Sequence, residues 1–178
     1  MNILLEIAYN GKNFHGWQRQ GNFRTIQKEL EEALVIFFTS EYAKQKKYRQ
    51  LTFSLKVSGR TDAGVSALQQ FATCNIPDDS GVSLDQLKKA LNGITTDDII
   101  IKSIQYVEDS FHARLTPHSK QYSYSILMNH FKSGAHEGNF WAIGKELNIS
   151  EMIIAAKYFK GAHDFSSFRA IDCCANST

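Results

Sequence analysis

The sequence is poor in cysteine and proline, and it has no long hydrophobic run. Its 178 residues include 3 cysteines and 2 prolines. An odd number of cysteines, two of them adjacent at Cys173 and Cys174, is neither a disulfide framework nor a zinc motif. No apolar stretch approaches the length of a membrane-spanning helix, and the start, MNILLEIAYNGK, lacks the basic region and cleavage site of a signal peptide. We therefore expect reduced thiols and a cytoplasmic protein.

The sequence also lacks a strong excess of charge of either sign. Its formal net charge is +2, which permits a nucleic-acid partner without indicating one. The 6 histidines are scattered and none forms an HExxH pair, so no metal site is predicted. A hydrophobic fraction of 43% is ordinary for a globular protein, and the length suits one medium domain or two small ones.

Hydrophobic periodicity predicts strands and helices in a definite order over residues 1–108. Apolar residues at helical spacing begin at Ile26, with Thr25 as the N-cap, and Ser83 opens a second helix with a capping box, which Gly93 ends. Strands are predicted over 4–9, 51–58, 71–76 and 99–107, of which 51–58 alternates apolar and polar residues. The order β-α-β-β-α-β is typical of the ferredoxin-like split βαβ unit. We therefore predict an α+β domain over 1–108, with both helices on one face of the sheet.

Residues 109–178 are predicted to begin a second, related α/β half. The segment 121–128 alternates as a strand, Asn148 to Glu151 resembles a capping box, and an apolar helix follows that ends at Gly161. One strand, one loop and one helix are too few to close a sheet. These elements either add to the first domain's sheet or belong to a half that is incomplete at its C-terminus, and we expect the second case.

The loop SGRTDAGVSA, Ser58 to Ala67, holds the strongest candidate for chemistry. Asp62 and Gly64 are good turn residues, because Asp bonds its own backbone and Gly permits positive φ. Alternatively, Arg60 keeps Asp62 ionised and oriented, and an ionised carboxylate can act as a nucleophile on a glycosidic carbon. The local pattern leaves both interpretations open.

Two further segments have a structural and a functional interpretation each. In FHGWQRQ, Phe14 to Gln20, rings and Arg19 suit contacts to bases and phosphates, or Phe14 and Trp17 are core and Arg19 faces solvent. Trp17 follows Gly16 where a P-loop needs Lys, which excludes a P-loop. Tyr122, beside Tyr124 on the apolar side of a predicted strand, is either core or a platform for a flipped base.

Taken together, five segments resemble one family. They are YNGKNFHGWQRQ, the helix TIQKELEEAL, SGRTDAGVSA, DSFHARLTPHSKQYSYSI and HDFSSFRA, in that order along almost the whole chain. This pattern is similar to the tRNA pseudouridine synthase A family, and GRTDAGV is its most specific part.

The resemblance implies an isomerase that converts uridine to pseudouridine in the anticodon stem-loop of tRNA, without cofactor or metal. It implies two linked α/β halves with the catalytic cleft between them, and a homodimer in the complete protein. The family's catalytic aspartate falls on Asp62, its arginine on Arg60 and its active-site tyrosine on Tyr122. The candidate contacts to RNA are Arg19, Arg114 and Lys120.

Two departures from the family pattern bear on these expectations. Family loops often carry His after GRTDAGV, where this sequence has Ser66. Family members also continue past HDFSSFRA into strands that supply an aliphatic wall and a basic partner for the aspartate, so we expect residues 1–178 alone to be weak or inactive on tRNA.

Two other functions compete with the enzyme. One is a non-catalytic RNA-binding module on the same split βαβ unit, but such modules need an aromatic run that LTFSLKVSG and QQFATCNI lack. The other, a small-ligand regulatory domain, rests on fold analogy alone.

Overall fold

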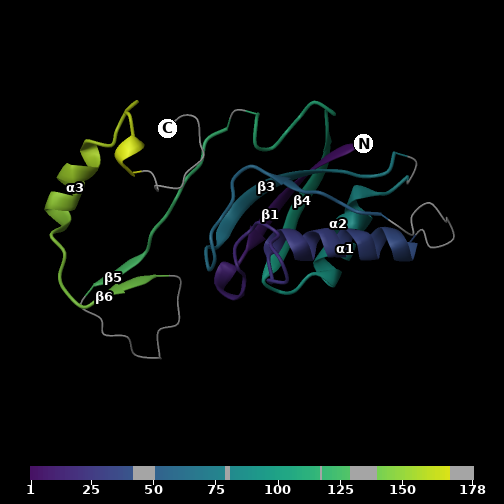
Figure 1. Ribbon diagram of the computed structural model, residues 1–178, viewed down its shortest axis with the longest axis horizontal. Helices are drawn as coiled ribbons and strands as arrows, with labels where there is room; N and C mark the ends of the chain where they lie inside the picture. The colour runs from purple at the N-terminus through teal and green to yellow at the C-terminus, as the bar shows by residue number, and fades with distance from the viewer. Residues whose placement is uncertain (42–50, 79–80, 117, 129–139, 169–178) are drawn as a thin grey trace. The chain divides into compact units, whose positions relative to one another are not determined.

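The computed structural model describes residues 1–41, 51–78, 81–116, 118–128 and 140–168. The chain divides into two compact units, Met1–Gln121 and Tyr122–Thr178 (Figure 1). Cys173, Cys174 and the last two residues of HDFSSFRA lie outside the described residues. The domain boundary near residue 108 stays a prediction.

The first unit is an antiparallel sheet with two helices, so the α+β class is confirmed. The strands lie in the order β2 (Lys56–Val57), β3 (Ala67–Asn75), β1 (Asn2–Tyr9) and β4 (Ile99–Val107). Along the chain, α1 (Ile26–Glu41) follows β1, and α2 (Leu84–Ile94) lies between β3 and β4. The elements therefore follow one another as the periodicity predicts, with a short 3-10 turn, η1 (Gly11–Asn13), added after β1.

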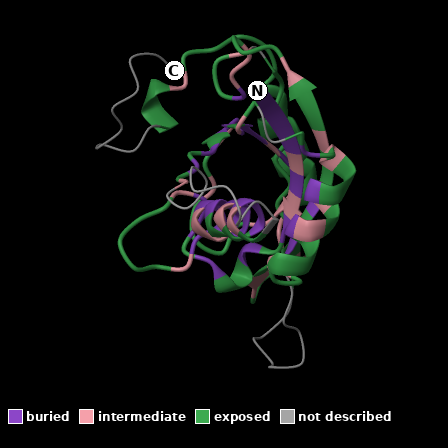
Figure 2. Cartoon of the chain, turned by 90° about the vertical axis from the view of Figure 1, so that its right-hand side faces the viewer, coloured by how far each residue is buried: buried purple, intermediate pink, exposed green. Residues whose placement is uncertain are grey.

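The core of the first unit lies between one face of the sheet and the two helices. Alternate residues of β1, from Ile3 to Tyr9, form one buried cluster with the stripe of α1 that starts at Ile26 and with Leu87 and Leu91 of α2. Figure 2 shows buried residues on α1 and on the strands that face it. Cys74 of β3 is part of this cluster, and burial raises the pKa of its thiol to about 12.

The segment 51–58 keeps its predicted alternation but pairs as a strand only at β2. Phe53, Leu55 and Val57 are buried, whereas the intervening side chains are exposed. The Leu55 N–H donates to the Glu31 carboxylate at 3.1 Å, so a side chain of α1 takes the place of a neighbouring strand.

Two predicted details of α2 are wrong. Ser83 occupies the N-cap position but makes no side-chain cap hydrogen bond. Gly93 lies inside the helix, which ends at Ile94, and the Thr95 hydroxyl donates to the Leu91 carbonyl at 2.8 Å. A hydroxyl that bonds the last turn therefore replaces the predicted glycine cap.

The second unit consists of short strands and helices, and its described residues form no buried core. Its elements are β5 (Ile126–Met128), which pairs in parallel with β6 (Trp141–Ile143), then α3 (Ile149–Lys157) and the 3-10 turn η3 (Ser166–Phe168). The capping prediction is confirmed, because the Glu151 N–H donates to Asn148 Oδ1 at 3.1 Å. The predicted strand is shorter than expected, and α3 ends before Gly161. None of the described residues of this unit is buried.

Candidate functional site

The loop from Ser58 to Ser66 joins β2 to β3 at one end of the sheet. The Val65 N–H donates to the Asp62 carbonyl at 3.2 Å, and Gly64 has a φ of 80°, so the chain does turn here. The side chains of Arg60 and Asp62 are exposed. Within the described part of the chain, the Asp62 carboxylate has neither a hydrogen bond nor an ion pair. The turn is therefore present, but among the described residues the Asp62 side chain makes neither the predicted bond to its own backbone nor a pair with Arg60. The backbone alone forms the turn, and the use of the exposed carboxylate in chemistry stays a prediction.

Two glycines of the segment after β1 lie directly against this loop. A Cβ at Gly16, where φ is 83°, would lie 2.6 Å from the Thr61 carbonyl oxygen, and one at Gly11 would lie 2.0 Å from the Val65 carbonyl oxygen. Both distances are shorter than any tolerable contact, so only glycine fits at either position. Hydrophobic periodicity does not predict this role. The signal was there in YNGKNFHG, where two glycines frame a short polar stretch.

Backbone hydrogen bonds fasten the loop to the same segment. The Trp17 N–H donates to the Thr61 carbonyl at 2.9 Å, and the Gly64 N–H donates to the Phe14 carbonyl at 3.1 Å. The Gly11 N–H donates to the Ser66 hydroxyl at 3.0 Å. At Ser66 the sequence departs from the histidine that is frequent in the family it resembles. The Ser66 hydroxyl is therefore an acceptor that closes the base of the loop.

The aromatic residues of FHGWQRQ are core residues. Phe14 is 3% exposed and Trp17 is 0% exposed, so neither ring is available to stack on a base. The guanidinium of Arg24 lies 4.3 Å from the centre of the Phe14 ring, which adds a cation–π contact. Among the described residues, the Trp17 indole N–H has no hydrogen-bond partner. The interpretation of these rings as base contacts is wrong, and the core interpretation is confirmed.

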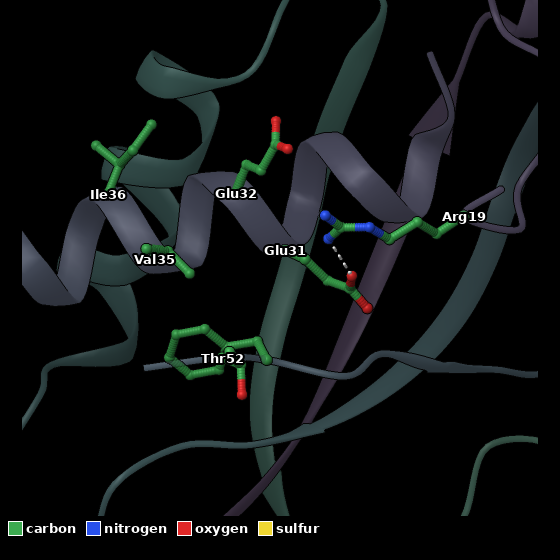
Figure 3. A pocket seen from close by; sticks show the side chains of 7 residues that line it. Arg19, Glu31, Glu32, Val35, Ile36 and Thr52 are labelled. Carbon is green, nitrogen blue, oxygen red and sulfur yellow. Dashed lines mark hydrogen bonds and ion pairs between the residues drawn. The ribbon is translucent and has the colours of Figure 1, made fainter. Parts of the chain in front are cut away.

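Arg19 is half exposed and forms an ion pair within its own unit. Its guanidinium lies 3.2 Å from the Glu31 carboxylate, whose side chain is 6% exposed (Figure 3). The Gln27 amide donates to the same carboxylate at 2.8 Å. Together with the bond from Leu55, this buried group ties α1 to the segment that leads into the Asp62 loop. The role of Arg19 in binding RNA stays a prediction.

A basic cavity of about 730 Å³ is lined in part by residues 54–60 of that segment and the loop. It brings Arg60 together with Arg114 and Lys120, which belong to a later segment of the sequence, and adds Lys56 and His112. Among the described residues that line it there is no Asp or Glu. Lys120 reaches over the loop backbone, since its Nζ lies 2.8 Å from where a Cβ on Gly59 would stand. An anion therefore finds four cationic side chains here without a competing carboxylate.

Tyr122 and Tyr124 both belong to the second unit and are exposed. The exposed fraction is 71% for Tyr122 and 86% for Tyr124. The interpretation of this pair as core is therefore wrong. The functional interpretation, a tyrosine available to a ligand, stays a prediction.

Among the described residues, no three His, Cys, Asp or Glu side chains gather where they could hold a metal ion. No helix in the described ranges combines the length and the apolar character that crossing a bilayer demands.

The chain is similar to several proteins that share one name. The chain is 38% identical over 177 residues to tRNA pseudouridine synthase A of Thermoanaerobacter sp. (strain X514), covering 99% of this chain and 67% of that protein. It is 38% identical over 167 residues to the protein of the same name from Dictyoglomus turgidum, and 39% identical over 167 residues to that of Thermosipho melanesiensis. These matches cover 94% of this chain and 64% and 63% of the two relatives. No family model matches the chain.

Proposed function

The chain belongs to the tRNA pseudouridine synthase A family, and from this premise we propose that it is an isomerase that converts uridine in tRNA to pseudouridine. The observation that carries the proposal is the Asp62 carboxylate, which is exposed and without a partner among the described residues, on a loop fixed by the glycine segment. A carboxylate held in this way is accessible to a substrate carbon. It is not consumed by an ion pair inside the protein.

The conversion of uridine to pseudouridine requires a group that acts at C1′ of the ribose. The bond between N1 of uracil and C1′ of ribose breaks, the base turns, and C5 joins C1′. The C5 proton leaves and N1 gains a proton, so atoms and electrons balance without a co-reactant. Because a stacked base hides these atoms, the nucleotide first leaves the stack. Asp62 then acts at C1′, either by direct attack or by promoting elimination through a glycal.

The basic cavity gives the RNA backbone a place to bind. Arg60 lies two positions before Asp62 and also lines the cavity with Arg114 and Lys120. We assign these three side chains to phosphates next to the extruded nucleotide, because cationic side chains hold the backbone while other groups act on the base. Arg19 is a more distant RNA contact, since it does not line this cavity.

The remaining assignments rest on the family. Tyr122 is the ring on which the extruded uracil stacks, and the catalytic cleft lies between the two α/β halves. The strand order β2-β3-β1-β4, all antiparallel, fits a ferredoxin-like first half. The substrate is the anticodon stem-loop of tRNA, and the complete protein is a cytoplasmic homodimer.

The test compares two carboxylates in the complete protein. Asp62→Asn is nearly isosteric and removes the charge. Asp85→Asn makes the same change at an exposed position in the first turn of α2. We expect pseudouridine formation to fall by more than roughly a thousandfold in the first variant only, while tRNA binding changes by less than about threefold in both.

Retained conversion in Asp62→Asn would remove this residue from the chemistry. If the unmodified complete protein binds tRNA but forms no pseudouridine, the non-catalytic RNA-binding module is the better description. The basic cavity is the feature that would favour it.

A further inference from the structure

Gln70 breaks the pattern of the strand that carries it. Gln70, Ala72 and Cys74 alternate on the inward face of β3, and all three are buried. An amide at an apolar position is destabilising unless both of its ends form hydrogen bonds. A polar residue at such a position can form bonds to the loop that an apolar side chain cannot form.

The Gln70 amide bonds the first residues of the Asp62 loop with both ends. Its Nε2 donates to the Gly59 carbonyl at 2.7 Å, and its Oε1 accepts the Ser58 hydroxyl at 2.5 Å. The Oε1 atom also lies 3.3 Å from the Phe71 N–H. The backbone on the N-terminal side of Arg60 is thereby fixed to the sheet.

Tyr9 holds the residue on the other side of Arg60, through that residue's side chain. It is the last inward residue of β1 and is 4% exposed, and its hydroxyl lies 2.8 Å from the Thr61 hydroxyl. Burial raises the pKa of Tyr9, so the phenol stays protonated over the physiological range. The Thr61 carbonyl is held separately by the Trp17 N–H, which leaves residue 61 with two fixed points.

We propose that Tyr9 and Gln70 are positioning residues, which hold the backbone on both sides of Arg60 so that Arg60 and Asp62 leave the sheet at fixed places. This inference rests on the proposed function, because it concerns the placement of that function's two loop side chains. A reacting group must be held to within about 0.5 Å, and a misplacement of about 1 Å can lower a rate by roughly a hundredfold. Both side chains are buried beneath the loop, so they act through loop residues 58, 59 and 61 and not on the substrate.

The first test removes one hydroxyl at a time in the complete protein. Tyr9→Phe and Thr61→Val each break the same bond with little change in shape, and Thr61→Ser keeps the hydroxyl. Tyr106→Phe is the matched control, because the Tyr106 hydroxyl donates to the Val82 carbonyl at 3.2 Å, outside the Asp62 loop.

We expect Tyr9→Phe and Thr61→Val each to lower kcat roughly tenfold and to change KM for tRNA by less than about twofold. This loss is smaller than the roughly hundredfold loss that a misplacement of about 1 Å can cause. The double variant should be no slower than either single one, and Thr61→Ser should recover most of kcat. Tyr106→Phe should leave kcat unchanged.

A second test makes the same comparison at Gln70. Gln70→Met removes both amide bonds at similar volume, and Gln69→Met makes the same change at the adjacent exposed residue. We expect the loss of kcat only at position 70. If Gln70→Met does not fold, Tyr9→Phe and Thr61→Val still decide the proposal.

Hydrogen exchange provides a readout that does not depend on catalysis. Amides of residues 58–66 should exchange faster in Tyr9→Phe than in Tyr106→Phe, because the loop opens locally when its support is removed. Equal exchange and equal kcat in these two variants would overturn the proposal. If the unmodified protein forms no pseudouridine, the proposed function fails, and exchange alone then decides whether Tyr9 fixes the loop.

Discussion

Helices α1 and α3 carry the same kind of apolar stripe, yet only α1 buries it. Ile26, Leu30 and Leu34 of α1 are 0% exposed, whereas Met152 and Ile153 of α3 are 43% and 57% exposed. The difference lies in what each helix meets. The first unit supplies a four-stranded sheet whose alternate residues face α1, and β5 and β6 of the second unit supply only three residues each. An amphipathic stripe stabilises a helix only where a second apolar surface is present.

The largest expected effect comes from separating the two units. Residues 1–121 expressed alone should unfold cooperatively with heat, because their core is complete among their own residues. Residues 122–178 alone should show no cooperative transition, since none of their described residues is buried. Circular dichroism during heating measures both. A sharp transition in the second fragment would contradict the comparison.

A smaller effect is expected from truncating one residue of each stripe. Leu34→Ala should lower the free energy of unfolding by about 2–5 kcal/mol, because it leaves a cavity in a fully buried site. Ile153→Ala should change it by less than about 0.5 kcal/mol, because that side chain is already largely in water. Denaturant titration of the complete protein measures both values. Equal losses would show that the α3 stripe is covered after all.

The next comparison separates close contact from backbone strain. Gly16 and Gly21 both have positive φ, at 83° and 46°, but only Gly16 lies against another segment. Gly21→Ala should cost about 1 kcal/mol for the left-handed backbone alone. Gly16→Ala should cost at least 1–2 kcal/mol more, because the Asp62 loop must move. If the two substitutions cost the same, the loop is not part of the first unit's packing.

The smallest effect should be electrostatic and dependent on pH. Glu6 of β1 lies 3.1 Å from the Lys102 ammonium and accepts bonds from Gln69 and Ser103. The bond to Lys102 is the main cause that lowers the pKa of Glu6 below its ordinary 4.5. Its stabilisation is thus present above pH 4.5 and is lost as pH falls below that value.

Glu6→Gln should therefore lower the free energy of unfolding by under about 1 kcal/mol at pH 7, and the loss should shrink as the pH falls below 4.5. Glu151→Gln, on the exposed helix α3, should have no measurable effect at either pH. Parallel denaturant titrations at pH 7 and pH 3.5 test this pair of substitutions. A loss that persists in acid would mean that Glu6 acts through packing.

The hydrophobic periodicity of the first unit was sufficient to predict its strands and helices. In a half-buried strand and in an amphipathic helix, the apolar residues recur with the period of that element. Its failures have local causes. The strand predicted over 51–58 pairs at only two residues, because Glu31 takes up the Leu55 N–H. The aromatic residues Phe14 and Trp17 had two interpretations of equal merit, and only the neighbours that cover them decided for the core.

In the candidate site, too, the sequence predicts some features and the tertiary contacts decide the others. The residue types of SGRTDAGVSA indicate both a turn and a carboxylate available for chemistry. The sequence alone therefore determined the α+β class and the order of the elements in the first unit, and it made Asp62 a candidate whose catalytic role stays a prediction. The tertiary structure decided three contacts between distant segments. It packs the Asp62 loop against Gly11 and Gly16, and it places Tyr9 and Gln70 in hydrogen-bond contact with that loop. It also brings Arg60, Arg114 and Lys120 to one cavity. The reason is physical: periodicity records which side of an element is buried, whereas contacts between distant segments arise only when the sheet and its loops are assembled.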